Sequence, residues 1–259
     1  MKKVQKGKRD IKSTIVFSIA LVIFVYALVR LGMIFWEYAK GQQSYKKLED
    51  FTSSTQIGKG GDLPEDFSVD FEALKEINPD VVGWIRFENM DISYPIVHGT
   101  DNDYYLTHSF DKQEIKCGSI FMEAENAADF SDDNTFIYGH NMKDKSMFAK
   151  LNQFKDEQIY KENPEFLIYT ESGIYRYSIF SCYVAETSWD SFTYQFANGK
   201  AYEEWLETVT DRSLYDTGVV PKQEQKQKTV TLMTCTSAGD NYRFLVHGTL
   251  TEIINQKTE

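Results

Sequence analysis

The residues best suited to covalent chemistry are a cysteine and an arginine near the C-terminus. A β-branched run from Thr229 to Thr234 ends at Cys235, a small polar turn follows, and a second apolar run begins near Arg243 and continues to Leu250. Two such runs joined by a turn that contains Gly, Asp and Asn are typical of a β-hairpin. Because a hairpin folds its strand ends together, the pattern predicts that the Cys235 thiol and the Arg243 guanidinium face one site.

A cysteine nucleophile acts as a thiolate and therefore needs a base or a cation nearby. Arginine stays protonated at neutral pH, so Arg243 could hold an oxyanion but could not take a proton. His140 is the strongest candidate for the base, because it follows a predicted strand and Gly139 at what would be the rim of a sheet. His247 is its rival. Strand alternation places His247 on the same face as Arg243 but about 13 Å further along, which favours a packed strand residue.

The other histidines and cysteines indicate no further chemistry. His98 and His108 lie in a loop rich in Tyr and Asp, and we expect them to be exposed or hydrogen-bonded. We expect Cys117 and Cys182 to be small, buried hydrophobic residues. The three cysteines include no C-x-x-C pair, and with the four histidines they show no metal-ligand spacing. The sequence therefore predicts no metal site and no disulfide framework.

The charge of the chain is divided unevenly. Residues 1–36 hold seven of the 28 basic residues and one of the 39 acidic residues, which leaves the remainder with a net charge of −17. Such an acidic domain repels phosphate backbones, so we expect no nucleic-acid partner. The simplest reason for the acidity is solubility.

Residues 14–36 form an apolar segment of 23 residues that only Arg30 interrupts. At about 1.5 Å per residue the segment can cross the roughly 30 Å hydrocarbon core of a bilayer. The basic residues before it predict a cytoplasmic N-terminus and an extracellular remainder. A cleaved signal peptide is the rival interpretation, but the segment is long and no clear small-residue cleavage site follows. The predicted parts are a cytoplasmic basic tail over 1–13, a transmembrane anchor over 14–36, an extracellular stalk and linker over 37–67, and a catalytic domain over 68–259.

Short β patterns dominate the last of these parts. About eight short strands with few helices predict a mainly β fold, a mostly antiparallel barrel or sandwich. A short amphipathic helix is expected over residues 70–77, and Met147, Leu151 and Phe154 mark one face of another. Strands are predicted over residues 81–87, 92–97, 119–122, 134–138, 165–170 and 174–184, and in the hairpin described above.

A connection of about 40 residues precedes the Cys235 strand. It contains a predicted helix with Tyr202, Trp205, Leu206 and Val209 at helical spacing. A long connection beside a candidate site often shapes a substrate groove. The alternative is a packed excursion that makes no contact with the substrate.

Together these residues resemble the sortases, and in detail the class B sortases. The family's Thr-Leu-x-Thr-Cys signature stands at residues 231–235, its arginine at Arg243, and its histidine at His140 within Tyr-Gly-His. The helix in the connection of residues 186–228 is also a class B feature. The resemblance covers about residues 68–252. Further segments similar to class B stand at residues 78–85, 94–95, 101–106 and 118–121.

The resemblance implies a closed eight-stranded sortase-like β-barrel with N-terminal helices and a helix-containing loop between strands 6 and 7. It implies a membrane-anchored cysteine transpeptidase outside a Gram-positive cell, with no cofactor. Cys235 would attack the Thr carbonyl of a C-terminal sorting motif on a secreted protein and form a thioacyl-enzyme. His140 would protonate the leaving amine and then deprotonate an amine of a peptidoglycan precursor or cross-bridge. Arg243 would stabilise the oxyanion or hold the substrate backbone.

The resemblance also implies residues that bind the substrate. By position, Asn102 and Leu106 match groove-lining residues, and Met233 and Tyr194 are further candidates. Met233 stands where class B members often have Ser, and His98 where Gln is common, so no sorting motif is assigned. Two alternatives stay open: a hydrolase of the same motif that passes the acyl group to water, and a non-catalytic surface binding domain. The intact catalytic pattern argues against the binding domain.

Overall fold

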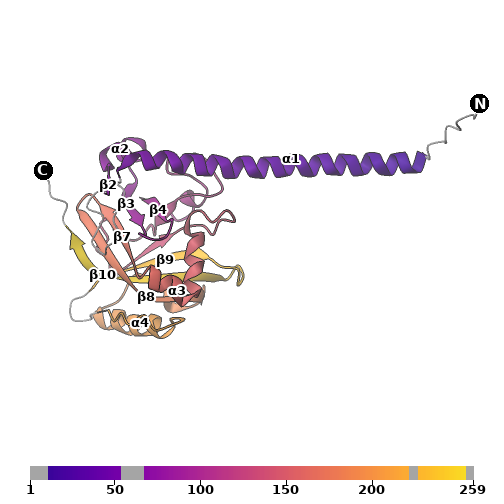
Figure 1. Cartoon of the computed structure of the whole chain (residues 1–259). Helices are drawn as coiled ribbons and strands as arrows, with labels where there is room; N and C mark the ends of the chain where they lie inside the picture. The colour runs from indigo at the N-terminus through magenta and orange to yellow at the C-terminus, as the bar shows by residue number, and fades with distance from the viewer. Residues whose placement is uncertain (1–10, 54–66, 222–226, 255–259) are drawn as a thin grey trace, which may run out of the picture. The chain divides into compact units, whose positions relative to one another are not determined.

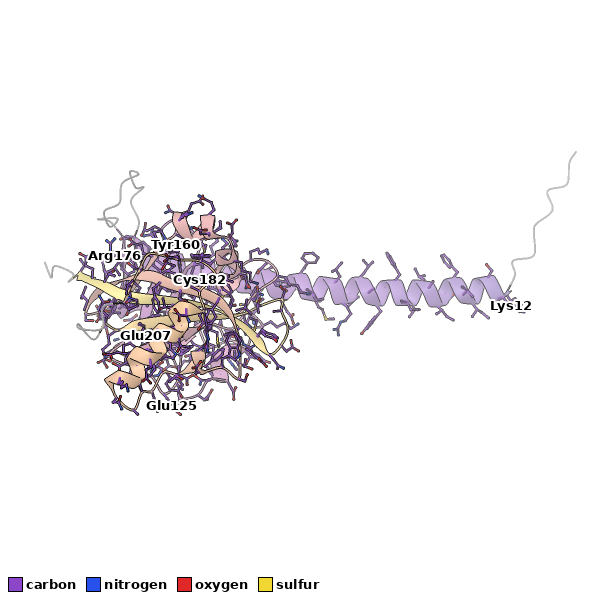
Figure 2. All side chains as sticks on the ribbon, turned by 90° about the horizontal axis from the view of Figure 1, so that it is seen from below. Lys12, Glu125, Tyr160, Arg176, Cys182 and Glu207 are labelled. Atoms are coloured by element: carbon purple, nitrogen blue, oxygen red, sulfur yellow. The ribbon has the colours of Figure 1, made fainter. Side chains whose placement is uncertain are left out.

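The computed structural model describes residues 11–53, 67–221 and 227–254 and divides into two units, residues 1–40 and 41–259. Helix α1 (Ile11–Leu48) supplies the described part of the first unit. Its large apolar side chains within residues 11–36 are exposed and project on both sides of the ribbon in Figure 2. By length and composition, α1 can cross a membrane, and it is the one helix among the described residues that can.

The second unit begins at Gly41, earlier than the folded domain predicted from residue 68. The last turns of α1 belong to it: Leu48 is buried, and the Tyr45 hydroxyl donates to the carbonyl of Gly118. After a short 3₁₀ helix, η1 (Glu49–Phe51), strand β1 (Thr52–Ser53) pairs with β2 (Ser68–Val69). Part of the predicted stalk therefore packs with the second unit. The predicted linker around residues 58–61 lies outside the described residues.

Helix α2 (Phe71–Ile77) is the short amphipathic helix that the sequence predicts. The Asp70 carboxylate accepts a hydrogen bond from the Ala73 N–H at 3.0 Å, which caps the first turn. Leu74 faces the core and is fully buried. The helix ends at Ile77, and its C-cap Asn78 precedes a proline that cannot continue it.

Within the described residues, eight strands close into a barrel in the order β10-β8-β7-β3-β4-β5-β6-β9, which confirms the predicted architecture. Figure 1 labels β3, β4, β7, β8, β9 and β10 of this barrel. Six of the eight neighbouring pairs are antiparallel, and the pairs β4–β5 and β6–β9 are parallel. The strands are β3 (Val81–Arg86), β4 (Ser93–His98), β5 (Ile120–Met122), β6 (Asn134–Tyr138), β7 (Glu165–Thr170), β8 (Gly173–Glu186), β9 (Thr229–Cys235) and β10 (Tyr242–Ile254).

Alternation along β9 separates an interior face from an outer face. Val230 and Leu232 belong to the barrel core, whereas Met233 packs against the cluster around helix α4 (Gly199–Asp211). This helix lies in the connection between β8 and β9, the sixth and seventh barrel strands, and packs on β8. As predicted, its buried side chains are Tyr202, Trp205, Leu206 and Val209.

Three short helices lie in other connections: η2 (Tyr104–Leu106), η3 (Phe148–Lys155) and α3 (Glu157–Glu162). A fourth, η4 (Asp190–Phe192), precedes α4 in the β8–β9 connection. The helix predicted around Leu151 is a 3₁₀ helix rather than an α-helix, and Met147 precedes it at φ 55°. His98 is the last residue of β4, so it does not lie in the loop to which the sequence pattern assigns it.

Candidate active site

The predicted hairpin brings Cys235 and Arg243 together. Cys235 is the last residue of β9, Arg243 is the second residue of β10, and the two are direct partners in the antiparallel register. Directly opposed side chains leave the same face of a sheet with their Cβ atoms about 5 Å apart. The Cys235 thiol is free and exposed, whereas Cys117 and Cys182 are free and buried. Burial raises the pKa of the Cys182 thiol to about 12, so it stays protonated.

The parallel pair β6–β9 brings His140 to the same rim. Tyr138 is the partner of Met233, and the Gly139 N–H donates to the Met233 carbonyl at 3.1 Å. His140 and Cys235 each lie two residues beyond that pair, so the register carries both to the same level. A Cβ on Gly139 would come within 2.5 Å of Ile120 and 2.7 Å of Phe148, so only glycine fits as the chain leaves the core.

The His140 ring is half-buried and is held through one nitrogen. Its Nε2 lies 2.8 Å from the carbonyl oxygen of Leu106. Among the described residues this is the one hydrogen bond of the ring, and none joins the ring to the Cys235 thiol. Among the described residues, the imidazole and the thiol therefore reach the same level of the barrel rim without a hydrogen bond between them.

The Arg243 guanidinium folds back on the hairpin turn. Its Nη1 donates to the carbonyls of Asp240 at 2.6 Å and Tyr242 at 3.0 Å. An arginine carries further N–H donors on Nε and Nη2. Two main-chain acceptors therefore hold the guanidinium on the hairpin turn, while other donors remain for an incoming carbonyl or oxyanion.

Helix η3 holds the backbone of both candidate residues, a role that sequence reasoning missed. The Phe148 N–H donates to the His140 carbonyl at 3.1 Å, and the Asn152 amide donates to the Cys235 carbonyl at 3.0 Å. The Lys155 ammonium donates to Thr236 just beyond the strand. The local sequence pattern does not predict the contacts to Cys235 and Thr236, because each joins residues more than 80 positions apart.

The predicted groove residues divide into two groups. Leu106 and Met233 lie beside the site: the Leu106 carbonyl meets His140, and Met233 precedes Cys235 by two residues on the same face. Asn102 and Tyr194 both attach to the segment after β5. The Asn102 side chain binds Glu123 and accepts from the Ala124 N–H at 2.9 Å.

Tyr194 contacts that same segment one position further on. Its hydroxyl donates to the Glu125 carboxylate at 3.1 Å, and its ring meets Phe136 edge-on at 6.3 Å. Within the described part of the chain, no hydrogen bond joins Asn102 or Tyr194 to Cys235 or His140. We call residues 123–125, which follow β5, the wall. The Asn102 side chain therefore binds to this wall, and Tyr194 attaches the β8–β9 connection to it.

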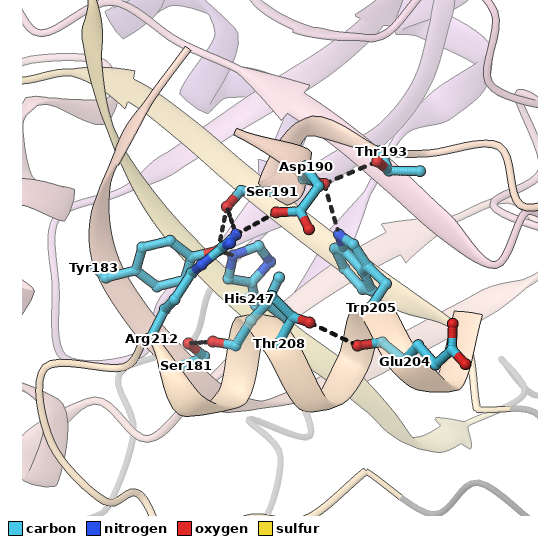
Figure 3. Close-up of polar contacts among 11 residues, drawn as sticks. Ser181, Tyr183, Asp190, Ser191, Thr193, Glu204, Trp205, Thr208, Arg212 and His247 are labelled. Carbon is cyan, nitrogen blue, oxygen red and sulfur yellow. Dashed lines mark hydrogen bonds and ion pairs between the residues drawn. The ribbon is translucent and has the colours of Figure 1, made fainter. Parts of the chain in front are cut away.

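His247 is a packed strand residue, as the sequence predicts. It is fully buried, with Nδ1 2.9 Å from the Thr231 hydroxyl. Its Nε2 lies 3.2 Å from the Tyr183 hydroxyl (Figure 3). Burial, with a smaller contribution from Arg212, lowers the pKa of His247 to about 3. The Trp205 ring packs edge-on against the His247 ring, with the ring centroids 5.7 Å apart. A ring enclosed in this way cannot serve the Cys235 thiol as a base.

The two remaining histidines are hydrogen-bonded, as predicted, and neither contacts the thiol. The His98 Nε2 lies 3.2 Å from the Ala124 carbonyl. His108 stacks on Tyr104 at 4.0 Å, with its Nδ1 2.8 Å from the Tyr104 carbonyl. His140 is thus the histidine that the fold brings to the rim beside Cys235.

A closed eight-stranded barrel with an exposed thiol, an imidazole and a guanidinium at one rim matches known proteins. The sortase domain profile matches residues 85–251. Sortase B of Listeria monocytogenes is 33% identical over 248 residues, which cover 93% of this chain and 98% of that protein.

Solved structures agree. The structure of sortase B from Bacillus anthracis in complex with AAEK1 has a TM-score of 0.71 at 28% identity, covering 86% of this chain and 100% of that chain. A Staphylococcus aureus sortase B–substrate complex has a TM-score of 0.66 at 28% identity, covering 71% of this chain and 85% of that chain. The chain therefore belongs to the sortase family, in its class B, and it is an enzyme of the transpeptidase type.

Proposed function

We propose that Cys235 is the nucleophile that cleaves a C-terminal sorting motif of a secreted protein after its Thr residue. The sulfur attacks the Thr carbonyl carbon and a tetrahedral intermediate forms. The peptide C–N bond then breaks and leaves a thioacyl-enzyme. The thiol proton passes through His140 to the leaving nitrogen, so the departing fragment leaves as an amine.

The second half reverses these roles. An amine of a peptidoglycan precursor or cross-bridge attacks the thioester carbonyl while His140 accepts its proton. The C–S bond breaks, the thiol is regenerated, and a new amide joins the secreted protein to the cell wall. The acyl group is transferred from one amine to another, so the two-step reaction needs no external energy source or cofactor.

Arg243 stabilises the oxyanion of both tetrahedral intermediates or holds the substrate backbone beside Cys235. Its position opposite Cys235 in the β9–β10 register supports this role. The two turn carbonyls that bind Nη1 limit the movement of the guanidinium before the substrate arrives. A donor that is already in place stabilises a developing charge more effectively than one that must reorganise.

The substrate lies along the outer face of β9 and the neighbouring walls. Met233 and the exposed Leu106 side chain contact the substrate next to the scissile bond. Tyr194 contacts it from the β8–β9 connection. Asn102 acts through the wall, because its amide is bonded to Glu123 and Ala124.

The catalytic unit works outside the cell from a single anchor. Helix α1 is apolar and long enough to span a bilayer. Seven basic residues stand within residues 1–36, six of them before the apolar run, which favours a cytoplasmic N-terminus. The acidic remainder follows on the extracellular side, where sorting signals and cell-wall amines are found.

The register that sets Cys235 opposite Arg243 and level with His140 is the observation that carries the proposal. We would incubate the full chain in detergent micelles with a pooled library of Thr-containing sorting peptides and measure intact mass. A gain equal to one acyl fragment, absent in Cys235→Ala and present in Cys182→Ala, is the expected result.

An added acceptor such as triglycine then separates transfer from hydrolysis. Ligated peptide supports the transpeptidase, whereas free acid alone would favour the hydrolase. No adduct and no cleavage across the library, with the Cys235 thiol still open to alkylation, would contradict both and favour a binding role.

A further inference from the structure

The hydrogen bond of His140 determines which ring nitrogen carries the proton. Its partner, the Leu106 carbonyl oxygen, can only accept. Nε2 must therefore be the protonated nitrogen when the ring is neutral. Nδ1 is then the atom with a free lone pair.

The Leu106 carbonyl belongs to a turn that is fixed at its beginning. The Asp101 carboxylate accepts from the N–H groups of Asp103 at 2.8 Å and Tyr104 at 2.7 Å. These two bonds, that from Tyr104 first, hold the pKa of Asp101 below its ordinary value, so it is ionised at neutral pH. The turn closes with bonds from Leu106 N to Asp103 O and from Thr107 N to Tyr104 O, both 3.2 Å.

The same turn is fixed from behind. Tyr105 is fully buried, and its hydroxyl donates to the Asp80 carboxylate at 2.6 Å and accepts from Asn78 at 2.9 Å. Gly118, at φ +53°, packs directly against the turn. A Cβ at this position would lie 2.6 Å from the Leu106 carbonyl oxygen, so a side chain there would displace that oxygen.

We propose that the main-chain carbonyl of Leu106 orients His140 so that proton transfer runs through Nδ1. The turn that carries this carbonyl is fixed at its start by the Asp101 carboxylate and packs closely against Gly118. This inference rests on the proposed role of His140 as general acid and base. The Nε2 proton stays in place, while the proton from the Cys235 thiol is carried on Nδ1 to the leaving nitrogen. The carbonyl fixes the tautomer and rotation of the ring, as a carboxylate does in other catalytic sites.

Asp101 is accordingly a positioning residue that touches neither substrate nor thiol. Its carboxylate acts through the turn, and the turn acts through one carbonyl. This role is separate from that of the Leu106 side chain, which is exposed and available to the substrate groove.

The first test is direct. The full chain would be labelled with ¹⁵N-histidine in detergent micelles, and long-range ¹H–¹⁵N spectra would show which nitrogen of each ring is protonated. The chain has four histidines, so loss of one signal set in His140→Gln assigns the ring. Neutral His140 with protonated Nε2 is the expected result, and protonated Nδ1 would overturn the proposal.

The second test perturbs the turn on its exposed side. In Asp101→Ala we expect a mixture of His140 tautomers and a kcat about tenfold lower, with KM unchanged, on the peptide that forms the adduct in the mass screen. Asp101→Asn keeps an acceptor oxygen and should recover most of the rate. Asp103→Ala is the matched control, because that exposed side chain makes no capping bond.

Failure of the inference and failure of the proposed function look different. Full activity in His140→Gln would remove the general acid and base role, and the inference with it. An inactive His140→Gln beside an Asp101→Ala variant with wild-type tautomer and wild-type kcat would overturn the orienting role alone.

Discussion

Strand β9 has a histidine beside each of its edges, and the fold treats the two in opposite ways. His140 follows β6, the parallel neighbour, and His247 lies on β10, the antiparallel neighbour. His140 is half-buried at the rim with one nitrogen bonded to a carbonyl. His247 lies under the helix of the β8–β9 connection with both nitrogens near hydroxyls. The difference shows that burial by neighbouring elements, rather than residue type or strand position, decides which histidine remains available for chemistry.

The cover over His247 is a connected set of polar groups (Figure 3). The Tyr183 hydroxyl meets His247 and Ser191, and Ser191 accepts from Arg212 at 2.7 Å. Arg212 also pairs with Asp190 of η4. The set fastens the β8–β9 connection to the outer face of the barrel.

The strongest test of the comparison exchanges each histidine for glutamine. His140→Gln removes the proposed proton carrier, and we expect thioacyl formation to slow by about 10²- to 10⁴-fold with little change in thermal stability. His247→Gln should keep its rate while losing about 1–3 kcal/mol of stability, because buried hydroxyls lose a fitted partner. Adduct formation by mass spectrometry and thermal unfolding measure the two effects. An active His140→Gln variant would break the comparison.

The pH dependence of stability sharpens the same comparison. The folded state holds the pKa of His247 near 3, below the value of about 6.5 in the unfolded chain. Below pH 6.5 the His247 side chain binds a proton in the unfolded chain but stays neutral in the folded state until the pH approaches 3. The free energy of unfolding should therefore fall by about 1.4 kcal/mol per pH unit towards pH 3 and be fully recovered above pH 6.5. Urea unfolding of wild type and His247→Gln isolates this slope, and equal slopes in both would contradict it.

A smaller effect should follow from loosening the nucleophile without removing it. Asn152→Ala deletes the donor to the Cys235 carbonyl, and we expect adduct formation to slow by about fivefold to tenfold. Gln153→Ala changes the exposed neighbour on the same helix and is the matched control. Equal rates in the two variants would show that η3 does not position the strand end.

The smallest effect is expected where the connection meets the groove wall. Tyr194→Phe removes the exposed bond to Glu125 but keeps the ring against Phe136, so KM should rise by about twofold to threefold. Tyr194→Ala also removes the ring and should raise KM further. Steady-state rates on the selected peptide compare the two. A tenfold loss in Tyr194→Phe would place the hydroxyl at the substrate rather than at the wall.

Local patterns predicted most of the strands and the pairing of Cys235 with Arg243. A hairpin depends on residues that are close together in the sequence, because its turn and its two apolar runs fix the register between the two strands. The same holds for α2, where Asp70 caps the helix, and for α4, whose four apolar residues face one side. His98 and the 3₁₀ geometry of η3 differ from expectation because strand and helix ends depend on what packs beyond them.

The sequence by itself determined the chemical groups, the hairpin that pairs thiol with guanidinium, and the apolar N-terminal segment. Tertiary structure alone decided that His140 stands level with Cys235, because the parallel β6–β9 register joins residues 95 positions apart. It also decided which atoms hold the site: the Leu106 carbonyl on His140 and the Asn152 amide on Cys235. These contacts depend on closing long loops around one core, and no local spacing of residue types records where such loops meet.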